Sequence, residues 1–231
     1  TIAFTKDPSV LISGDGEYNI VFETNNVSIA YVTYKVDGVD YTVYDEENGV
    51  VRSDDAMHTV RVPQDQLDAA GSYTVVAKTV SSRDGFSITT SDQVTKTNTF
   101  NGYKGQKEVN FGFTSDTHWN NSSSSDYMTN FTKLVNNTLG RPDVMVLNGD
   151  IVDSLSTKGQ FDALFQIINI AGGNGTYPVL YTVGNHEKRG VYSKEIEKYQ
   201  QEVLALKNKR ICENCYVEIE LKSKYCPHCG F

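Results

Sequence analysis

The chain has 231 residues, 39% of them hydrophobic, and a formal net charge of -8. This length exceeds one average domain. The negative charge argues against nucleic acid as a partner, because phosphate backbones are bound by clustered cations. No run of about eighteen apolar residues occurs, so we expect no membrane span.

Residues 1–103 are predicted to form an all-β sandwich. Apolar and polar side chains alternate over residues 18–22 and again over residues 73–77, and a period of two indicates half-buried strands. The dipeptides Asp37-Gly38 and Asn48-Gly49 predict tight hairpin turns between such strands. His58 lies in this region and is interpreted as an ordinary surface or packing histidine.

Residues 107–190 show alternating strand and helix patterns. Short apolar, β-branched runs at residues 109–114, 144–148 and 179–183 indicate three buried strands. Between them, apolar residues recur at helical spacing over residues 128–139 and 161–168. The order strand–helix–strand–helix–strand predicts an α/β domain with a parallel sheet.

A polar motif follows each of these strands. The motifs are Asp116-Thr117-His118, Gly149-Asp150-Ile151-Val152-Asp153 and Gly184-Asn185-His186-Glu187. Parallel strands bring such residues together at the carboxyl edge of the sheet. Aspartate, histidine and asparagine side chains at one place suit a pair of divalent metals bridged by a carboxylate.

The order of the motifs and their residue types resemble those of the calcineurin-like metallophosphoesterases. The resemblance implies that two divalent or trivalent metals (Mn, Fe or Zn) are held by Asp116, His118, Asp150 and Asn185, with Asp150 as the bridge. It also implies hydrolysis of a phosphate mono- or diester by a metal-activated water, so the expected partner is a phosphate ester substrate.

The resemblance gives roles to the other motif residues as well. His186 is expected beside the leaving-group oxygen, as the catalytic acid or hydrogen-bond donor. Asp153 and Glu187 are expected to orient His118 or His186 from behind the metal ligands.

The chain also departs from the family pattern. Complete members carry a further histidine and a Gly-His-x-His motif, and no histidine after His186 stands in such a context. The second metal keeps only Asp150 and Asn185, and one sheet face is left uncovered. We therefore expect a truncated phosphoesterase domain of low activity, its missing half belonging to the parent sequence. The alternative is a non-catalytic interaction or scaffold protein with a degenerate phosphoesterase domain.

The first region resembles the fibronectin-III-like domain that precedes the catalytic domain in purple acid phosphatases and related bacterial phosphoesterases. The second region differs from the purple enzymes, because Asp153 stands where they have a tyrosine. The family resemblance is expected to end near residue 190.

Residues 193–231 are predicted to form a helix, reaching about residue 210, and a small zinc ribbon. All four cysteines of the chain lie here, as Cys212, Cys215, Cys226 and Cys229. Two CxxC pairs at short spacing are typical of a tetrahedral structural zinc, and two disulfides are the alternative. The tail resembles a bacterial zinc-ribbon protein. Thiolates favour the cytoplasm, whereas the first two regions favour an exported or cell-surface protein, so the compartment stays open.

Overall fold

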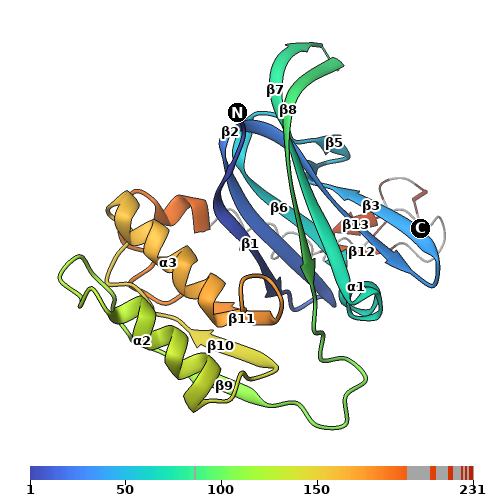
Figure 1. The fold of residues 1–231 in the computed structure, drawn as a ribbon. Coiled ribbons are helices and arrows are strands. Elements are labelled where there is room, and N and C mark those ends of the chain that lie inside the picture. Colours follow the sequence, from blue (N-terminus) through green and yellow to red (C-terminus); the bar gives the residue numbers. More distant parts are fainter. Residues whose placement is uncertain are drawn as a thin grey trace.

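The structure, a computed structural model, describes residues 1–85, 87–196, 209–211, 218–220, 225, 227, 229 and 230 (Figure 1). The first half of the chain contains β1 (Phe4–Ile12), β2 (Glu17–Val36), β3 (Val39–Tyr44), β4 (Glu46–Glu47), β5 (Val50–Val51), β6 (Asp55–Pro63), α1 (Gln64–Ala70), β7 (Ser72–Asp84) and β8 (Ser87–Thr99). The second half contains β9 (Phe111–Thr114), α2 (Tyr127–Lys133), the π-helical turn η1 (Leu134–Thr138), β10 (Val144–Asn148), α3 (Lys158–Ala171), β11 (Pro178–Thr182), β12 (Lys209–Ile211) and β13 (Glu218–Glu220).

The long strand β2 organises the first half. Its beginning pairs antiparallel with β1 and β6, and its end pairs antiparallel with β3 and β7, which in turn pairs with β8. Both parts of β2 contribute to one apolar core, whose fully buried members include Tyr18, Ile20, Phe22, Val32, Val60 and Tyr73. Tyr18, Ile20 and Phe22 face this core as the alternation predicts, but Asn19 and Val21 between them are also buried, so this part of β2 is covered on both faces and not half-buried.

Two predicted hairpin turns are confirmed. Asp37 and Gly38 join β2 to β3 with φ values of 50° and 80°, and Asn48 and Gly49 join β4 to β5 with 52° and 79°. Positive φ at both central residues is the geometry that matches the twist of the flanking strands.

Helix α1 was not expected in a region predicted to be all-β. It has seven residues, and Leu67 is its fully buried apolar anchor. A helix of two turns is too short to show a hydrophobic period, so the sequence pattern does not reveal it.

The two halves share one sheet. Strand β1 pairs in parallel with β11, placing Val10 opposite Pro178 and Leu11 opposite Val179. The described strands form a nine-stranded sheet in the order β8-β7-β2-β1-β11-β10-β9, with β3 and β6 also paired to β2. The predicted parallel arrangement of β9, β10 and β11 is confirmed. The separate sandwich of residues 1–103 stays a prediction.

Helices α2 and α3 lie along one face of the β9–β11 part of the sheet (Figure 1). Helix α3 begins at a capping box, in which Thr157 accepts from the backbone N–H of Gln160. Its apolar side chains pack with Met145, Leu147 and Val179 of the sheet. On the edge strand β9, by contrast, Phe111 and Phe113 are 63% and 64% exposed, whereas Val144, the neighbour of Phe111 on β10, is fully buried. Within the described residues, the open surface is therefore at β9 and does not extend over the whole sheet face.

The end of the predicted final helix is wrong. Residues 193–196 are helical, but Lys209 and Arg210 belong to β12, which pairs antiparallel with β13. The pairing with residues 218–220 fixes an extended backbone where the apolar stripe predicted a helix to residue 210. Cys212, Cys215 and Cys226 lie outside the described residues, and Cys229 is exposed. None of the described helices is long and apolar enough to cross a membrane.

Candidate metal centre

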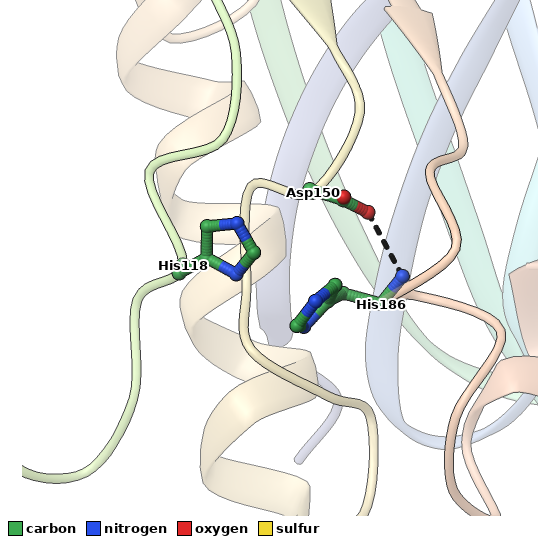
Figure 2. A group of neighbouring side chains, drawn as sticks. All are labelled: His118, Asp150 and His186. Atoms are coloured by element: carbon green, nitrogen blue, oxygen red, sulfur yellow. Dashed lines mark hydrogen bonds between the residues drawn. The ribbon is translucent and has the colours of Figure 1, made fainter.

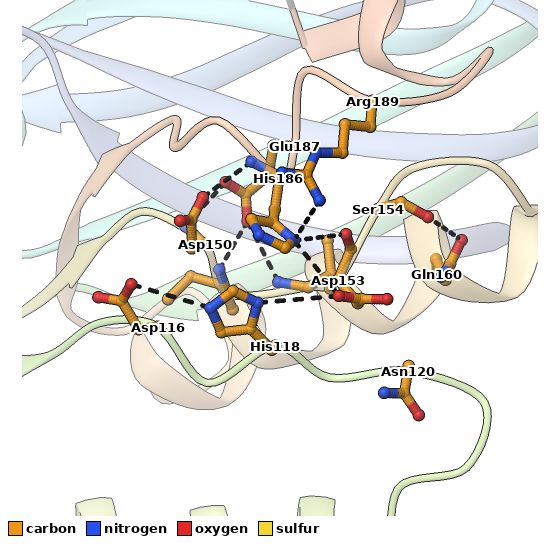
Figure 3. A network of polar contacts seen from close by, with 12 residues as sticks. Asp116, His118, Asn120, Asp150, Asp153, Ser154, Gln160, His186, Glu187 and Arg189 are labelled. Carbon is orange, nitrogen blue, oxygen red and sulfur yellow. Dashed lines mark hydrogen bonds and ion pairs between the residues drawn. The ribbon is translucent and has the colours of Figure 1, made fainter.

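Three loops meet beyond the carboxyl ends of β9, β10 and β11 (Figure 3). The first two loops are joined through the backbone: the N–H of Asp116 donates to Gly149 O (3.1 Å), and that of His118 donates to Asp150 O (3.0 Å). The second and third loops are in close contact at Gly184. A Cβ on this residue would lie only 2.1 Å from Asp150 Oδ1. Only glycine allows this approach, which explains its place in the third motif.

The backbone is strained at the site. Of the seven non-glycine residues with positive φ in the described part of the chain, three are predicted metal ligands, Asp116 (53°), His118 (48°) and Asp150 (51°). Such conformations persist only where the surrounding structure imposes them, and they concentrate at functional sites. Here the backbone bonds between the loops impose them.

His118, Asp150 and His186 converge (Figure 2). One ligand atom from each lies within 4.8 Å of the others. The two imidazole rings meet edge to face, with centroids 4.1 Å apart, and Asp150 Oδ1 accepts from the backbone N–H of His186 (2.8 Å). All three residues are partly exposed. Imidazole nitrogens and a carboxylate oxygen suit Mn, Fe or Zn, so the residues fit one metal.

Asp116 lies at the rim of this group. Its Oδ1 is 3.8 Å from His118 Nε2, and its side chain is 66% exposed. The structure therefore brings Asp116 beside the cluster without placing it among the three converging ligand atoms.

Asp153 lies between the two histidines. Its Oδ1 is 3.3 Å from His186 Nδ1 and 3.8 Å from His118 Nδ1, while its backbone O is 2.7 Å from His186 Nδ1. An N–H on His186 Nδ1 that donates to this carbonyl leaves Nε2 free to bind a metal. This position suits the predicted role of orienting the rings.

Glu187 is fully buried, and its side chain forms hydrogen bonds with backbone N–H groups. Its carboxylate accepts from the N–H groups of Asp150 (2.9 Å), Ile151 (2.6 Å), Val152 (3.1 Å) and Gly184 (2.8 Å). These bonds hold the Asp150 loop and the third motif together. Glu187 thus supports Asp150 through the main chain, where the sequence predicted that it would orient a histidine ring.

The carboxylates of Glu187 and Asp150 create a negative electrostatic potential around the buried Tyr181. Burial, together with the charges of Glu187 and Asp150, raises the pKa of Tyr181 well above its ordinary value. A cation bound at the loops would lie in this field, which favours positive charge.

Asn185 lies between Asp150 and Arg189. With its nitrogen toward Asp150, the amide donates to Oδ2 (2.9 Å) and accepts from Arg189 Nη2 (3.0 Å); with its oxygen toward Asp150, the two oxygens face each other as two ligands of one cation would. Arg189 Nη1 also lies 3.3 Å from His186 Nδ1. A second metal was expected to rely on Asp150 and Asn185, and this expectation stays a prediction. The sequence analysis assigned no role to Arg189, which stands two residues after the third motif.

Comparisons with known proteins give the family and the fold. A calcineurin-like phosphoesterase family profile matches residues 109–230, a span that includes all three motifs. The expected end of the resemblance near residue 190 is therefore wrong. The fold is similar to that of a solved purple acid phosphatase, PPD1, from yellow lupin (Lupinus luteus) seeds, with a TM-score of 0.50 and 17% identity. The match covers 78% of this chain but only 35% of the lupin chain. No curated protein sequence matches significantly.

Proposed function

The chain belongs to the calcineurin-like phosphoesterase family, and we propose that it hydrolyses a phosphate mono- or diester with a metal-activated water. The observation that carries this proposal is the convergence of His118, Asp150 and His186 within 4.8 Å. The strained backbone at His118 and Asp150 supports it, because the fold maintains these conformations at the edge where α/β sheets build their sites.

The residues divide into those that hold a metal and those that hold the ligands. His118, Asp150 and His186 would bind the ion, with Asp116 at the rim. A metal bound there supplies an acidified water and neutralises phosphoryl oxygens. Asp153 fixes the rotation of the imidazoles, and Glu187 fixes the loop that carries Asp150.

His186 has two candidate roles. The family resemblance implies an acid beside the leaving group, whereas the proximity of its ring to His118 and Asp150, with ligand atoms within 4.8 Å, supports a role as a metal ligand. The change His186→Gln separates them. If His186 is a ligand, metal affinity falls together with turnover; if it is an acid, metal affinity is kept and only turnover falls.

The test combines metal binding with hydrolysis. We expect Mn²⁺ to bind the purified chain, measured by titration calorimetry, and to support slow hydrolysis of p-nitrophenyl phosphate or bis-p-nitrophenyl phosphate. Mn²⁺ binding without hydrolysis of either ester would favour the alternative function, a non-catalytic interaction or scaffold protein.

We further propose that Cys212, Cys215, Cys226 and Cys229 hold one structural zinc. The paired CxxC spacing supports this, as does the position of the first pair between the paired strands β12 and β13. Four thiolates leave no open coordination position, so this zinc would not take part in hydrolysis. Elemental analysis should find one zinc per chain, and two disulfides by mass spectrometry would contradict the proposal.

A further inference from the structure

We propose that the buried pair of His58 and Asp45 holds one extra proton in the folded protein, and that loss of this proton at high pH loosens the hairpin of β4 and β5. Asp45 leads directly into that hairpin, and the proton completes a chain of hydrogen bonds in the first half of the molecule. This pH-sensitive device is independent of hydrolysis at the metal centre.

Four polar contacts form the chain. Thr24 Oγ1 lies 2.8 Å from Asn26 O and 2.9 Å from Ser28 Oγ. His58 Nε2 lies 2.7 Å from Ser28 Oγ, and His58 Nδ1 lies 2.8 Å from Asp45 Oδ2. Thr24, Ser28, His58 and Asp45 are at most 2% exposed, so bulk solvent does not reach these contacts.

The number of protons in the chain can be counted. Each contact of this length needs one proton between its two atoms, because two lone pairs facing each other repel. The ends of the chain are a backbone carbonyl and a carboxylate, which only accept. Two hydroxyls and a neutral imidazole supply three protons for the four contacts, whichever atom donates in each. The distances between the heavy atoms therefore call for one proton more than a neutral histidine and an ionised aspartate carry.

Arg52 favours the imidazole as the carrier of this proton. Its Nε lies 3.4 Å from Asp45 Oδ1, and a guanidinium beside a carboxylate stabilises the ionised carboxylate. His58 is then an imidazolium that donates from both nitrogens, to Asp45 and to Ser28.

Other charged groups near the chain bind elsewhere. Glu47 pairs with Arg52 (3.9 Å), and Asp55 accepts from the N–H groups of the two residues that follow it (2.8 and 3.0 Å). The β7 residue opposite the serine of the chain is the uncharged Thr79. Within the described residues, the carboxylate of the pair is therefore the charged group that His58 contacts.

Asp45 is also the point at which the hairpin of β4 and β5 is attached. Its N–H donates to Ala30 O of β2 (2.9 Å), and its O accepts from the N–H of Arg52 (2.9 Å). The two short strands pair with each other and with no other described strand, and Val50 is 57% exposed. When the imidazolium loses its proton, one buried contact of the chain is left without a hydrogen bond. The hairpin is expected to loosen because its anchoring residue belongs to this chain.

The direction of the pH dependence follows from the proton count. A proton that is held in the folded state and released in the unfolded state makes the fold more stable at low pH. An unfolded histidine releases its proton near about pH 6.5, so the contribution is complete below that value. Above it, the equilibrium constant for folding should fall by up to about tenfold per pH unit, until the folded protein also releases the proton.

Two measurements on the full chain test the proposal. NMR of the isotope-labelled ring nitrogens counts the protons on His58, and the signals that disappear in His58→Gln assign them. Urea denaturation between about pH 6 and about pH 9 compares the wild type with Ser28→Ala, in which the remaining contacts no longer need the extra proton. Ser13→Ala is the matched control, because it removes a buried serine hydroxyl that has no hydrogen-bond partner.

We expect both ring nitrogens of His58 to carry a proton in the folded protein at about pH 7, where a histidine in an unfolded chain is mostly neutral. As the pH rises, the backbone amide signals of residues 46–51 should shift together with those of His58. The folding constant of the wild type should fall more steeply with pH than that of Ser28→Ala, by up to about tenfold per pH unit, and Ser13→Ala should follow the wild type.

A neutral His58 ring in the folded wild type at about pH 7 would overturn the proposal, and so would parallel pH dependences in the wild type and Ser28→Ala. Hairpin signals that stay unchanged while His58 loses its proton would overturn the link to β4 and β5. If Ser28→Ala does not fold, the proton count and the hairpin signals of the wild type decide, because neither needs a variant that removes a contact of the chain in order to be read.

Discussion

The described part of the chain contains two clusters of histidine and aspartate with similar chemistry and opposite surroundings. In the first half, His58 Nδ1 lies 2.8 Å from Asp45 Oδ2, and His58 Nε2 lies 2.7 Å from Ser28 Oγ. These three residues are buried, none more than 1% exposed. At the sheet edge, His118 and His186 lie beside Asp150 in a partly exposed group.

The difference shows that residue types alone do not define a site. A serine, a histidine and an aspartate in hydrogen-bond contact have the composition of a hydrolytic triad, yet Ser28 and His58 have no exposed surface on which a substrate could bind. Their polar atoms satisfy one another and join β2 to β6. In the exposed cluster, the ligand atoms converge and the backbone is strained. Access and strain therefore separate the functional cluster from the structural one.

The largest effect is expected from Asp150→Asn. Removing the carboxylate should weaken Mn²⁺ binding by at least about 100-fold, since even residues behind the ligands commonly cost 10–100-fold. Calorimetry measures the affinity. Asp126→Asn, an exposed aspartate outside the cluster, is the control for the charge change and should bind as wild type. Unchanged binding in Asp150→Asn would place the metal elsewhere.

The buried cluster should respond in the opposite way. His58→Ala leaves Asp45 and Ser28 without their shared partner in the core, so we expect the free energy of unfolding to fall by roughly 3 kcal/mol. Urea denaturation measures this. Mn²⁺ affinity of the folded variant should not change, and a selective loss of metal binding would mean that the two clusters are coupled.

Much of the fold could be predicted from local pattern. The runs of residues 144–148 and 179–183 became β10 and β11 nearly to the residue, because buried parallel strands are continuous apolar runs. The pairing of β1 with β11 could not be predicted in this way. Val10 and Pro178 lie far apart in the sequence, and no local period encodes which distant strand edge a strand will meet.

For the site, too, the positions of the residues could be predicted from the sequence but their contacts could not. The motifs located Asp150 and His186 at a shared sheet edge, because each follows a strand. The position of Arg189 beside His186 could not be predicted, since it depends on a turn held by Leu155. The backbone target of Glu187 escaped prediction for the same reason: loop geometry, not residue type, decides which donors a carboxylate meets.

Glu187→Gln tests whether the buried Glu187 carboxylate contributes both to the stability of the fold and to metal binding by the exposed cluster. The amide would present N–H groups to backbone donors, so some of the four bonds to Glu187 would be lost in a buried place. We expect a loss of about 2 kcal/mol in unfolding free energy and, through the displaced Asp150 loop, about tenfold weaker Mn²⁺ binding. Denaturation and calorimetry on one preparation measure both. Loss of stability with full metal affinity would show that Asp150 keeps its place without this support.

The smallest effect concerns the contact between the two halves. Lys6 of β1 is buried, forms an ion pair with Glu23 and another with Asp162 of α3 (2.9 Å), and lies over the ring of Phe161 (4.9 Å). Burial alone would raise the pKa of Asp162, but hydrogen bonds from Lys158 and Lys6 outweigh it, so the pKa lies below its ordinary value.

A carboxylate whose pKa is lowered in the folded state contributes stability above its unfolded pKa of about 4, and this contribution is lost as the pH falls through the lower folded value. Asp162 is 43% exposed, so solvent screening limits the contribution to less than about 1 kcal/mol. Asp162→Asn should therefore be slightly less stable than wild type at pH 7 and should converge with it below about pH 3. Urea denaturation at several pH values measures the difference, with Asp126→Asn as the control. A stability gap that persists in acid would mean that packing of Asp162 against its neighbours, not its charge, connects α3 to β1.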